Sequence, residues 1–340
     1  MRLQSTTASP DARAGTVDGA APLTLFSIPK PFVGHTGVIQ TNAVMSWARL
    51  VRPRHLVLCG NDQGVAEIAC RIGAEHLSDL PLSDLGTPYV TDAFHRVIEQ
   101  ATTFWVCYVN ADIILDASLA RALNSFRPKR PTLIVGQRTD TDIDHLVDFD
   151  DARTELAIRE IGSGIGKLSP TNAIDYLAFT PGAWLDAMPR FIVGRPGWDN
   201  WFLYNALCRG VCLVDGTCDI LAIHQSHDYG HVPESTGRAW EGPEADYNRR
   251  LIESHDHYFT IDYATHLLVG GQIKRALQRR HLKARWARLL PGEGYLRRRL
   301  RFCRRLLRFG TRLTRYYILS PAKHAILRRE RRPGDPPRWR

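Results

Sequence analysis

The stretch Phe104-Trp-Val-Cys-Tyr-Val109, followed at once by Asn110-Ala111-Asp112, decides the fold class. This apolar run has the length of a strand and lacks the alternation of a strand with one wet face. A strand that is apolar on both sides and lies between helical patterns belongs to a mostly parallel sheet covered by helices. The sequence therefore predicts an α/β fold with Asn110 and Asp112 at the carboxyl end of a strand, where open α/β sheets usually bind ligands.

The segments on either side continue the alternation of strands and helices. Thr87 is expected to cap a helix that starts at Pro88 and runs to about residue 102. Aromatic residues dominate another expected helix, at 198–208. Further strands are expected at 23–28, 55–59, 133–137, 175–179, 211–214 and 220–223, with helices from Thr36, after residue 64 and at 181–188.

Charge divides the chain into an acidic part and a basic part. The whole chain carries +10, but residues 272–340 carry +20, with 23 Lys and Arg against 3 Asp and Glu, so the remainder carries −10. A uniformly basic nucleic-acid-binding protein is therefore a poor description, and nucleic acid is an unlikely partner. We expect a disordered leader at 1–22, a globular domain at 23–271 and a basic amphipathic helical tail at 272–340.

The tail and the cysteines bear on location. Arginines alternate with Leu, Phe, Trp and Tyr in the tail, a pattern typical of helices that lie on anionic membrane surfaces. The chain has no run of 18 apolar residues, no apolar segment of a secretory signal and no C-x-x-C pair. We therefore expect reduced thiols in a cytoplasmic protein that is peripheral at the inner face of the membrane.

Asp112 is a candidate ligand for a divalent cation. A carboxylate at the end of a buried strand can hold Mg²⁺ or Mn²⁺ while diphosphate oxygens and water complete the coordination. The alternative, that Asp112 only caps the following turn, has similar weight from spacing alone.

Three histidines, His224, His227 and His231, follow a late apolar strand. Imidazole is a common ligand of transition metals, so one or two of them are candidate metal ligands. Solvated or backbone-bonded histidines are the alternative, and spacing leaves it open.

Asp199 opens an expected helix between the indoles of Trp198 and Trp201. Apolar neighbours raise the pKa of a carboxyl group and make it a usable general base, and the indoles can form a platform for a sugar ring. The alternative is an acidic residue that offsets the helix dipole while both tryptophans belong to the core.

Taken together, the order of these segments resembles a glycosyltransferase of the GT-A fold, similar to the family 2 enzymes and their relatives. The resemblance covers about residues 23 to 260. It is carried by Ile28-Pro-Lys-Pro-Phe32, Gly86-Thr-Pro88, Tyr108-Val-Asn-Ala-Asp-Ile-Ile-Leu115, Thr180-Pro-Gly-Ala-Trp184, Gly197-Trp-Asp-Asn-Trp201 and Ile223-His-Gln-Ser-His-Asp-Tyr229.

The resemblance implies a metal-dependent transferase, with Mn²⁺ or Mg²⁺, that moves a sugar from a UDP- or GDP-sugar to a hydroxyl of a glycan, a lipid-linked molecule or another acceptor. Asp112 and one of His224 and His227 would bind the metal, and Asp199 would be the base of an inverting reaction. The donor would contact Pro29, Lys30, Asp62, Gly86, Thr87, Asn110 and Asp112, and the acceptor Asp175, Trp198 and Trp201.

The sequence departs from the family pattern in two places. Asn110 replaces the first Asp of the family's D-x-D motif, and Asp199 stands alone where many relatives have an acidic pair. Two other functions stay open: a nucleotidyltransferase of the same fold, and a non-catalytic membrane- or nucleic-acid-binding protein with a degenerate GT-A domain.

Overall fold

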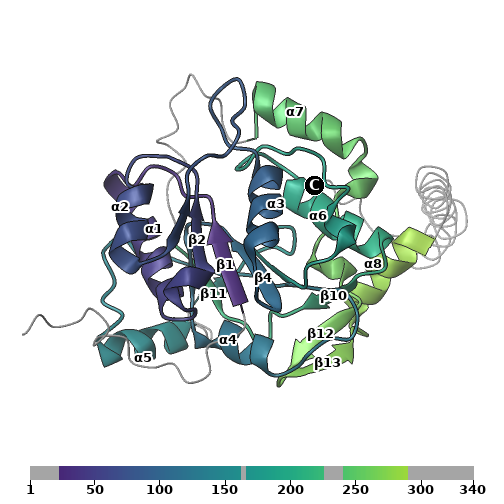
Figure 1. Cartoon of the computed structure of the whole chain (residues 1–340). Helices are drawn as coiled ribbons and strands as arrows, with labels where there is room; N and C mark the ends of the chain where they lie inside the picture. The colour runs from purple at the N-terminus through teal and green to yellow at the C-terminus, as the bar shows by residue number, and fades with distance from the viewer. Residues whose placement is uncertain (1–22, 162–165, 226–239, 290–340) are drawn as a thin grey trace, which may run out of the picture. The chain divides into compact units, whose positions relative to one another are not determined.

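The computed structural model describes residues 23–161, 166–225 and 240–289. The chain divides into two compact units, and the boundary lies between His281 and Leu282. The first unit contains the expected sheet together with the helices that cover it (Figure 1).

The main sheet has nine strands in the order β13-β12-β10-β6-β9-β4-β1-β2-β3. Strand β9 is antiparallel to β4 and β6, β13 is antiparallel to β12, and the other neighbours are parallel. The predicted mostly parallel sheet is thus confirmed. The strands are β1 (Leu23–Ser27), β2 (Leu56–Cys59), β3 (Glu75–Leu77), β4 (Trp105–Val109), β6 (Thr132–Val135), β9 (Tyr176–Phe179), β10 (Cys212–Asp215), β12 (His266–Val269) and β13 (Gln272–Arg275).

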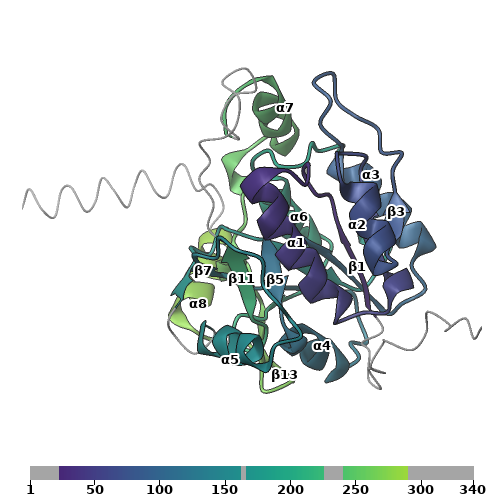
Figure 2. The same ribbon diagram turned by 90° about the vertical axis from the view of Figure 1, so that its left-hand side faces the viewer.

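A smaller sheet brings distant segments to the end of β4. Its order is β5-β11-β7-β8, formed by Ile113–Leu115, Ala222–Gln225, Thr139–Thr141 and Lys167–Leu168. In its register His224 pairs with Ile113 on one side and with Asp140 on the other. Figure 2 shows β5, β7 and β11 together beside α1 (Gly34–Ala48). Asp112, which directly precedes β5, therefore lies near two residues that are remote in sequence.

Helices cover both faces of the main sheet, as the two-sided apolar strands require. Alternate residues of β4 enter different cores: Cys107 packs with α1, α2 (Val65–Ile72) and α4 (Ala117–Asn124), whereas Tyr108 packs with α3 (Val90–Gln100) and α6 (Trp198–Cys208). The remaining helices are α5 (Ala152–Glu160), α7 (Pro243–Ile252) and α8 (Arg279–Leu289), with short 3₁₀ turns η2 (Pro53–His55), η4 (Ala183–Leu185), η7 (His255–His257) and η8 (Ile261–Tyr263).

Two expected helices differ in the structure. The helix expected from Thr87 starts at Val90, because Leu82 pairs with Pro88 and the Ser83 amide donates to the Thr87 carbonyl at 2.9 Å, which closes a turn ahead of the helix. The helix expected at 181–188 is only the 3₁₀ turn η4, where the Leu185 amide bonds to the Gly182 carbonyl three residues back.

The segment 272–281, expected to begin the tail, lies in the first compact unit. Strand β13 pairs with β12, and the Ala276 amide donates to the Thr265 carbonyl at 3.0 Å. Among the described residues, no helix has the length and apolarity needed to cross a membrane. The six described cysteines are all free, and those at 59, 107 and 212 are buried.

Candidate functional site

A carboxylate, a histidine and a second carboxylate meet at the carboxyl end of β4. The Nε2 atom of His224 lies 3.5 Å from Oδ2 of Asp112, and its Nδ1 atom lies 3.2 Å from Oδ1 of Asp140. His224 is buried, whereas the side chains of Asp112 and Asp140 are partly open to solvent. The carboxylate of Asp140 thus lies at one nitrogen of the imidazole and that of Asp112 at the other, which fixes the orientation of the ring.

Arg138 joins this group to the buried Asp175. Its Nη1 atom donates to both carboxylate oxygens of Asp175 at 2.8 Å, and its Nε atom donates to Oδ1 of Asp140 at 2.8 Å. Burial raises the pKa of Asp175, and the positive charge of Arg138 opposes this rise. Since Asp140 also lies against His224, one guanidinium fixes the carboxylate that orients the imidazole.

Asn110, the residue in place of an acidic one, is fully engaged at its side chain. Its Nδ2 atom donates to Oδ1 of Asp175 at 2.8 Å, and its Oδ1 atom accepts from the hydroxyl of Tyr108 at 3.0 Å. An amide can donate to Asp175, whereas a carboxylate at this position would repel it. The departure from D-x-D therefore has a structural reason.

The pair Asp112 and His224 suits one divalent cation. Atoms 3.5 Å apart are close to the spacing of neighbouring ligands on an ion with bonds of about 2.1 Å. Carboxylate oxygen and imidazole nitrogen are both common ligands of divalent metal ions. Among the described residues, no group of three or more His, Cys, Asp or Glu side chains forms a metal site. A cation here would thus take further ligands from a diphosphate and water. His227 lies outside the described residues.

Asp199 stands in the first turn of α6, at the same edge of the sheet. Burial raises its pKa to about 7, and the negative charge of Asp175 adds to the rise, while a hydrogen bond from the Asn200 amide lowers it. Burial raises the pKa of Tyr108, and the charges of Asp112, Asp199 and Asp175 add to the rise. The Tyr108 ring lies 5.2 Å from that of Trp198. The charges of Asp199 and Asp112 thus both act on Tyr108 near the end of β4. A carboxyl with the pKa of Asp199 can accept a proton near neutral pH.

Both tryptophans beside Asp199 are core residues. Trp198 packs against Phe94 and Tyr108, and Trp201 packs against Phe191 with ring centroids 5.4 Å apart. Their exposures of 5% and 8% leave little indole surface for a sugar ring. Contact of these indoles with an acceptor therefore stays a prediction, with only a small exposed area to support it.

Gly86 and Thr87 belong to a turn that is bonded to Glu244 of α7, the helix labelled at the top of Figure 1. The buried carboxylate of Glu244 accepts from the hydroxyls of Ser83 and Thr87, and from Nε and Nη2 of Arg195 at 2.8 and 2.6 Å. Arg195 precedes the helix that begins at Trp198. Glu244 therefore connects the turn, α7 and the loop that leads to Asp199.

The loops expected to hold a nucleoside lie together. The Phe32 amide donates to the Gln63 carbonyl at 2.8 Å, which joins the segment after β1 to the loop after β2 that contains Asp62. Gln40 fixes Lys30 through both backbone groups, at 2.7 and 2.8 Å, and the Lys30 side chain is exposed. The segment with Pro29 and Lys30 thus lies beside the loop with Asp62. Contact of these three residues with a donor stays a prediction.

Sequence reasoning missed Arg138, Asp140 and Glu244. An Arg and an Asp directly after the strand at 133–137 were the available signal for the first two. Glu244 had none, since it meets Thr87 across 157 positions of sequence.

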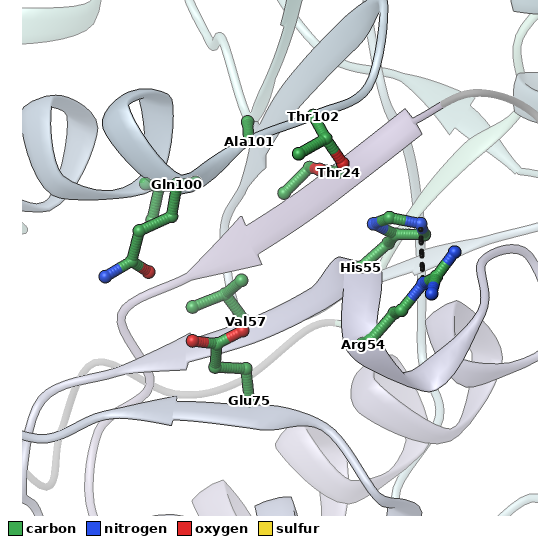
Figure 3. A pocket seen from close by; sticks show the side chains of 9 residues that line it. Thr24, Arg54, His55, Val57, Glu75, Gln100, Ala101 and Thr102 are labelled. Carbon is green, nitrogen blue, oxygen red and sulfur yellow. Dashed lines mark hydrogen bonds between the residues drawn. The ribbon is translucent and has the colours of Figure 1, made fainter.

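A cavity of about 310 Å³ lies elsewhere, at the amino ends of β1 and β2 (Figure 3). Its lining includes Arg54, His55, Val57, Glu75 and Gln100. Strand direction places it opposite the edge that carries Asp112, so it belongs to no part of the candidate site.

Comparison with known proteins gives likeness of fold alone. No family model matches the chain, and no curated protein matches it. The solved structures that resemble it include GT-A glycosyltransferases, the class that the sequence also resembles.

Three of these structures show how low the similarity is. Glucosyl-3-phosphoglycerate synthase of Mycobacterium tuberculosis has a TM-score of 0.39 and 13% identity over 69% of this chain and 80% of that one. The complex of that enzyme with Mn²⁺, UDP and phosphoglyceric acid has a TM-score of 0.36 and 14% identity over 65% of this chain and 75% of that one. S. aureus TarS 1–349 in complex with UDP-GlcNAc has a TM-score of 0.41 and 13% identity over 67% of this chain and 64% of that one. We transfer no residue roles from them.

Proposed function

We propose that this protein is a metal-dependent glycosyltransferase that moves a sugar from a UDP- or GDP-sugar to an acceptor hydroxyl with inversion. The observation that carries the proposal is the meeting of Asp112 and His224 at 3.5 Å, at the edge of the sheet where Asp199 has a pKa of about 7. One group suits a cation that binds a diphosphate, and the other suits removal of a proton.

Each residue has a distinct part in this reaction. Asp112 and His224 would hold Mn²⁺ or Mg²⁺, which when bound neutralises charge on the departing diphosphate. Asp140 and Arg138 keep His224 oriented. Asp199 accepts the proton of the acceptor hydroxyl as that oxygen attacks the anomeric carbon. Pro29, Lys30 and Asp62 border the nucleoside, and Asp175 contributes through its bonds to Arg138 and Asn110.

The test is transfer, or hydrolysis of the donor, from a panel of UDP- and GDP-sugars with Mn²⁺ or Mg²⁺. The proposal expects activity that Asp199→Asn reduces by at least about a hundredfold, which is typical of lost general-base catalysis. Asp112→Ala is expected to reduce it as well, because the cation loses a ligand. Asp186→Asn, an exposed acid outside the site, is the matched control. Full activity in both site variants would overturn the residue assignment. Release of pyrophosphate from a nucleoside triphosphate and a sugar phosphate would instead indicate a nucleotidyltransferase.

We further propose that the basic tail attaches the protein to an anionic membrane at the cytoplasmic face, near a glycan or lipid-linked acceptor. Residues 282–340, which follow the first compact unit, hold 19 Lys and Arg against 3 Asp and Glu, and this supports the proposal because each Lys or Arg near such a surface contributes about 1 kcal/mol. The full chain is expected to co-sediment with phosphatidylserine-containing vesicles and not with neutral ones. A chain that ends at His281 keeps the first compact unit whole and should stay unbound.

A further inference from the structure

The beginning of α8 is joined to the strand ends beside the candidate site. Arg280 donates through Nη1 to Oε1 of Gln137 at 2.9 Å and through Nη2 to the buried carboxylate of Asp215 at the end of β10. His281, which is fully buried, lies with Nδ1 3.0 Å from the Asp262 carbonyl oxygen. Arg280 is thus held on a well-anchored turn of helix.

Gln137 occupies the turn between β6 and β7 and has its other groups bonded as well. Its amide donates to the Thr217 hydroxyl at 2.9 Å, and its Nε2 atom donates to the Ser169 carbonyl at 2.5 Å. The hydroxyl and amide of Thr217 in turn donate to Asp215, the same carboxylate that Arg280 reaches. Arg280 therefore closes a ring of contacts around this turn.

The next residue of the turn is Arg138, which holds Asp175 and Asp140 at 2.8 Å. The Ser169 amide donates to the Arg138 carbonyl at 2.9 Å, so the backbone of Arg138 and the side chain of Gln137 are tied to the same residue. Asp140 lies 3.2 Å from His224. A continuous series of contacts thus runs from α8 to the proposed metal ligand.

We infer that Arg280 is a positioning residue for the metal site: through Gln137 it fixes the turn that presents Arg138 to Asp140 and Asp175. The inference rests on the proposed function and extends it, since it makes the first turn of the basic tail part of the structure that supports the site. Arg279, the neighbouring arginine on α8, is exposed and serves as a matched control.

The test is the affinity of the full chain for Mn²⁺, measured by electron paramagnetic resonance in the presence of UDP or GDP, together with donor KM and kcat. Arg280→Ala and Gln137→Ala are each expected to raise the Mn²⁺ Kd about threefold to tenfold, below the 10–100-fold typical of a ligand's direct partner. Arg279→Ala should leave it unchanged. Combined, the two changes should cost less than the product of their separate effects, because both break one interaction.

Two results would overturn the inference: a Kd in folded Gln137→Ala equal to that of the native chain, or independent effects of the two substitutions. If Arg280→Ala does not fold, Gln137→Ala, which keeps the Arg280–Asp215 ion pair, decides alone. Asp112→Ala distinguishes failure of the positioning role from failure of the proposed metal site. If it removes Mn²⁺ binding while the Gln137 variant binds normally, only the positioning role fails; if Mn²⁺ binding survives in Asp112→Ala, the proposed metal site fails as well.

Discussion

The Nε2 atom of His224 on β11 lies 3.5 Å from Oδ2 of Asp112, which precedes β5, and the antiparallel pairing of these strands creates this contact. Removing either side chain would deprive a cation at this point of one of its two protein ligands. We predict that Asp112→Asn and His224→Ala each weaken Mn²⁺ binding in the presence of UDP or GDP at least about tenfold. Calorimetric titration measures this, with Asp186→Asn as control. Equal affinities in all three variants would exclude the pair as the metal site.

The pKa of Asp199 predicts the pH dependence of transfer. The ionised form is the proposed base, so kcat/KM should rise with pH up to about 7 and then level off. Asp199→Asn should remove this rise together with most of the activity. A pH series at fixed ionic strength measures it. An ascending limb that persists in the Asn variant would assign the base to another group.

The same carboxyl predicts a change in stability. Its folded-state pKa, about 7, lies above the ordinary value of 3.8, so the folded protein binds more protons than the unfolded chain between these pH values. Its contribution to the free energy of unfolding is therefore complete below about pH 3.8 and is lost as pH rises through 7. Asp199→Asn should be more stable than the native chain at pH 8, and the gap should narrow at pH 5. Urea unfolding at the two pH values measures both.

Prediction from sequence succeeded where local apolar pattern determines structure. The two-sided run at 104–109 predicted β4 and its helices on both faces, and the helix at 198–208 was found at those bounds. It failed where distant contacts decide. The turn around Thr87, ahead of α3, is held by Glu244, which is 157 positions away in the sequence. The link from Arg138 to Asp175 depends on the insertion of antiparallel β9 between β4 and β6, and strand order is not written in any local pattern.

Asn110 allows a test of why this chain departs from D-x-D. Asn110→Asp replaces a donor to the buried Asp175 by a second carboxylate, so one of the two groups must stay protonated or unbonded. We predict that the variant is destabilised by about 1–3 kcal/mol and binds Mn²⁺ no better than the native chain. Thermal unfolding and metal titration measure these effects. A tighter, equally stable Asn110→Asp protein would show that the amide is not needed at this position.

We predict that Glu244 affects Asp199 indirectly, through the loop that begins at Arg195. Removing the carboxylate in Glu244→Ala leaves the largely buried Arg195 without its partner and should destabilise the fold by about 3 kcal/mol. Hydrogen bonds from Ser83, Arg195 and Thr87 outweigh the effect of burial and lower the pKa of Glu244 from 4.5. Its contribution is therefore present above about pH 4.5 and is lost as pH falls through the lowered value.

The control for Glu244 is Asp246→Asn on the same helix, whose exposed ion pair with Arg249 should be worth less than about 1 kcal/mol. Glu244→Gln keeps acceptors for the two hydroxyls and should lie between the Ala variant and the native chain. Because Arg195 begins the loop that leads to Asp199, both Glu244 variants should lower kcat more than they raise donor KM. Denaturant unfolding and steady-state kinetics together test whether Glu244 acts on catalysis as well as on stability. A loss of stability with unchanged kcat would confine Glu244 to a structural role.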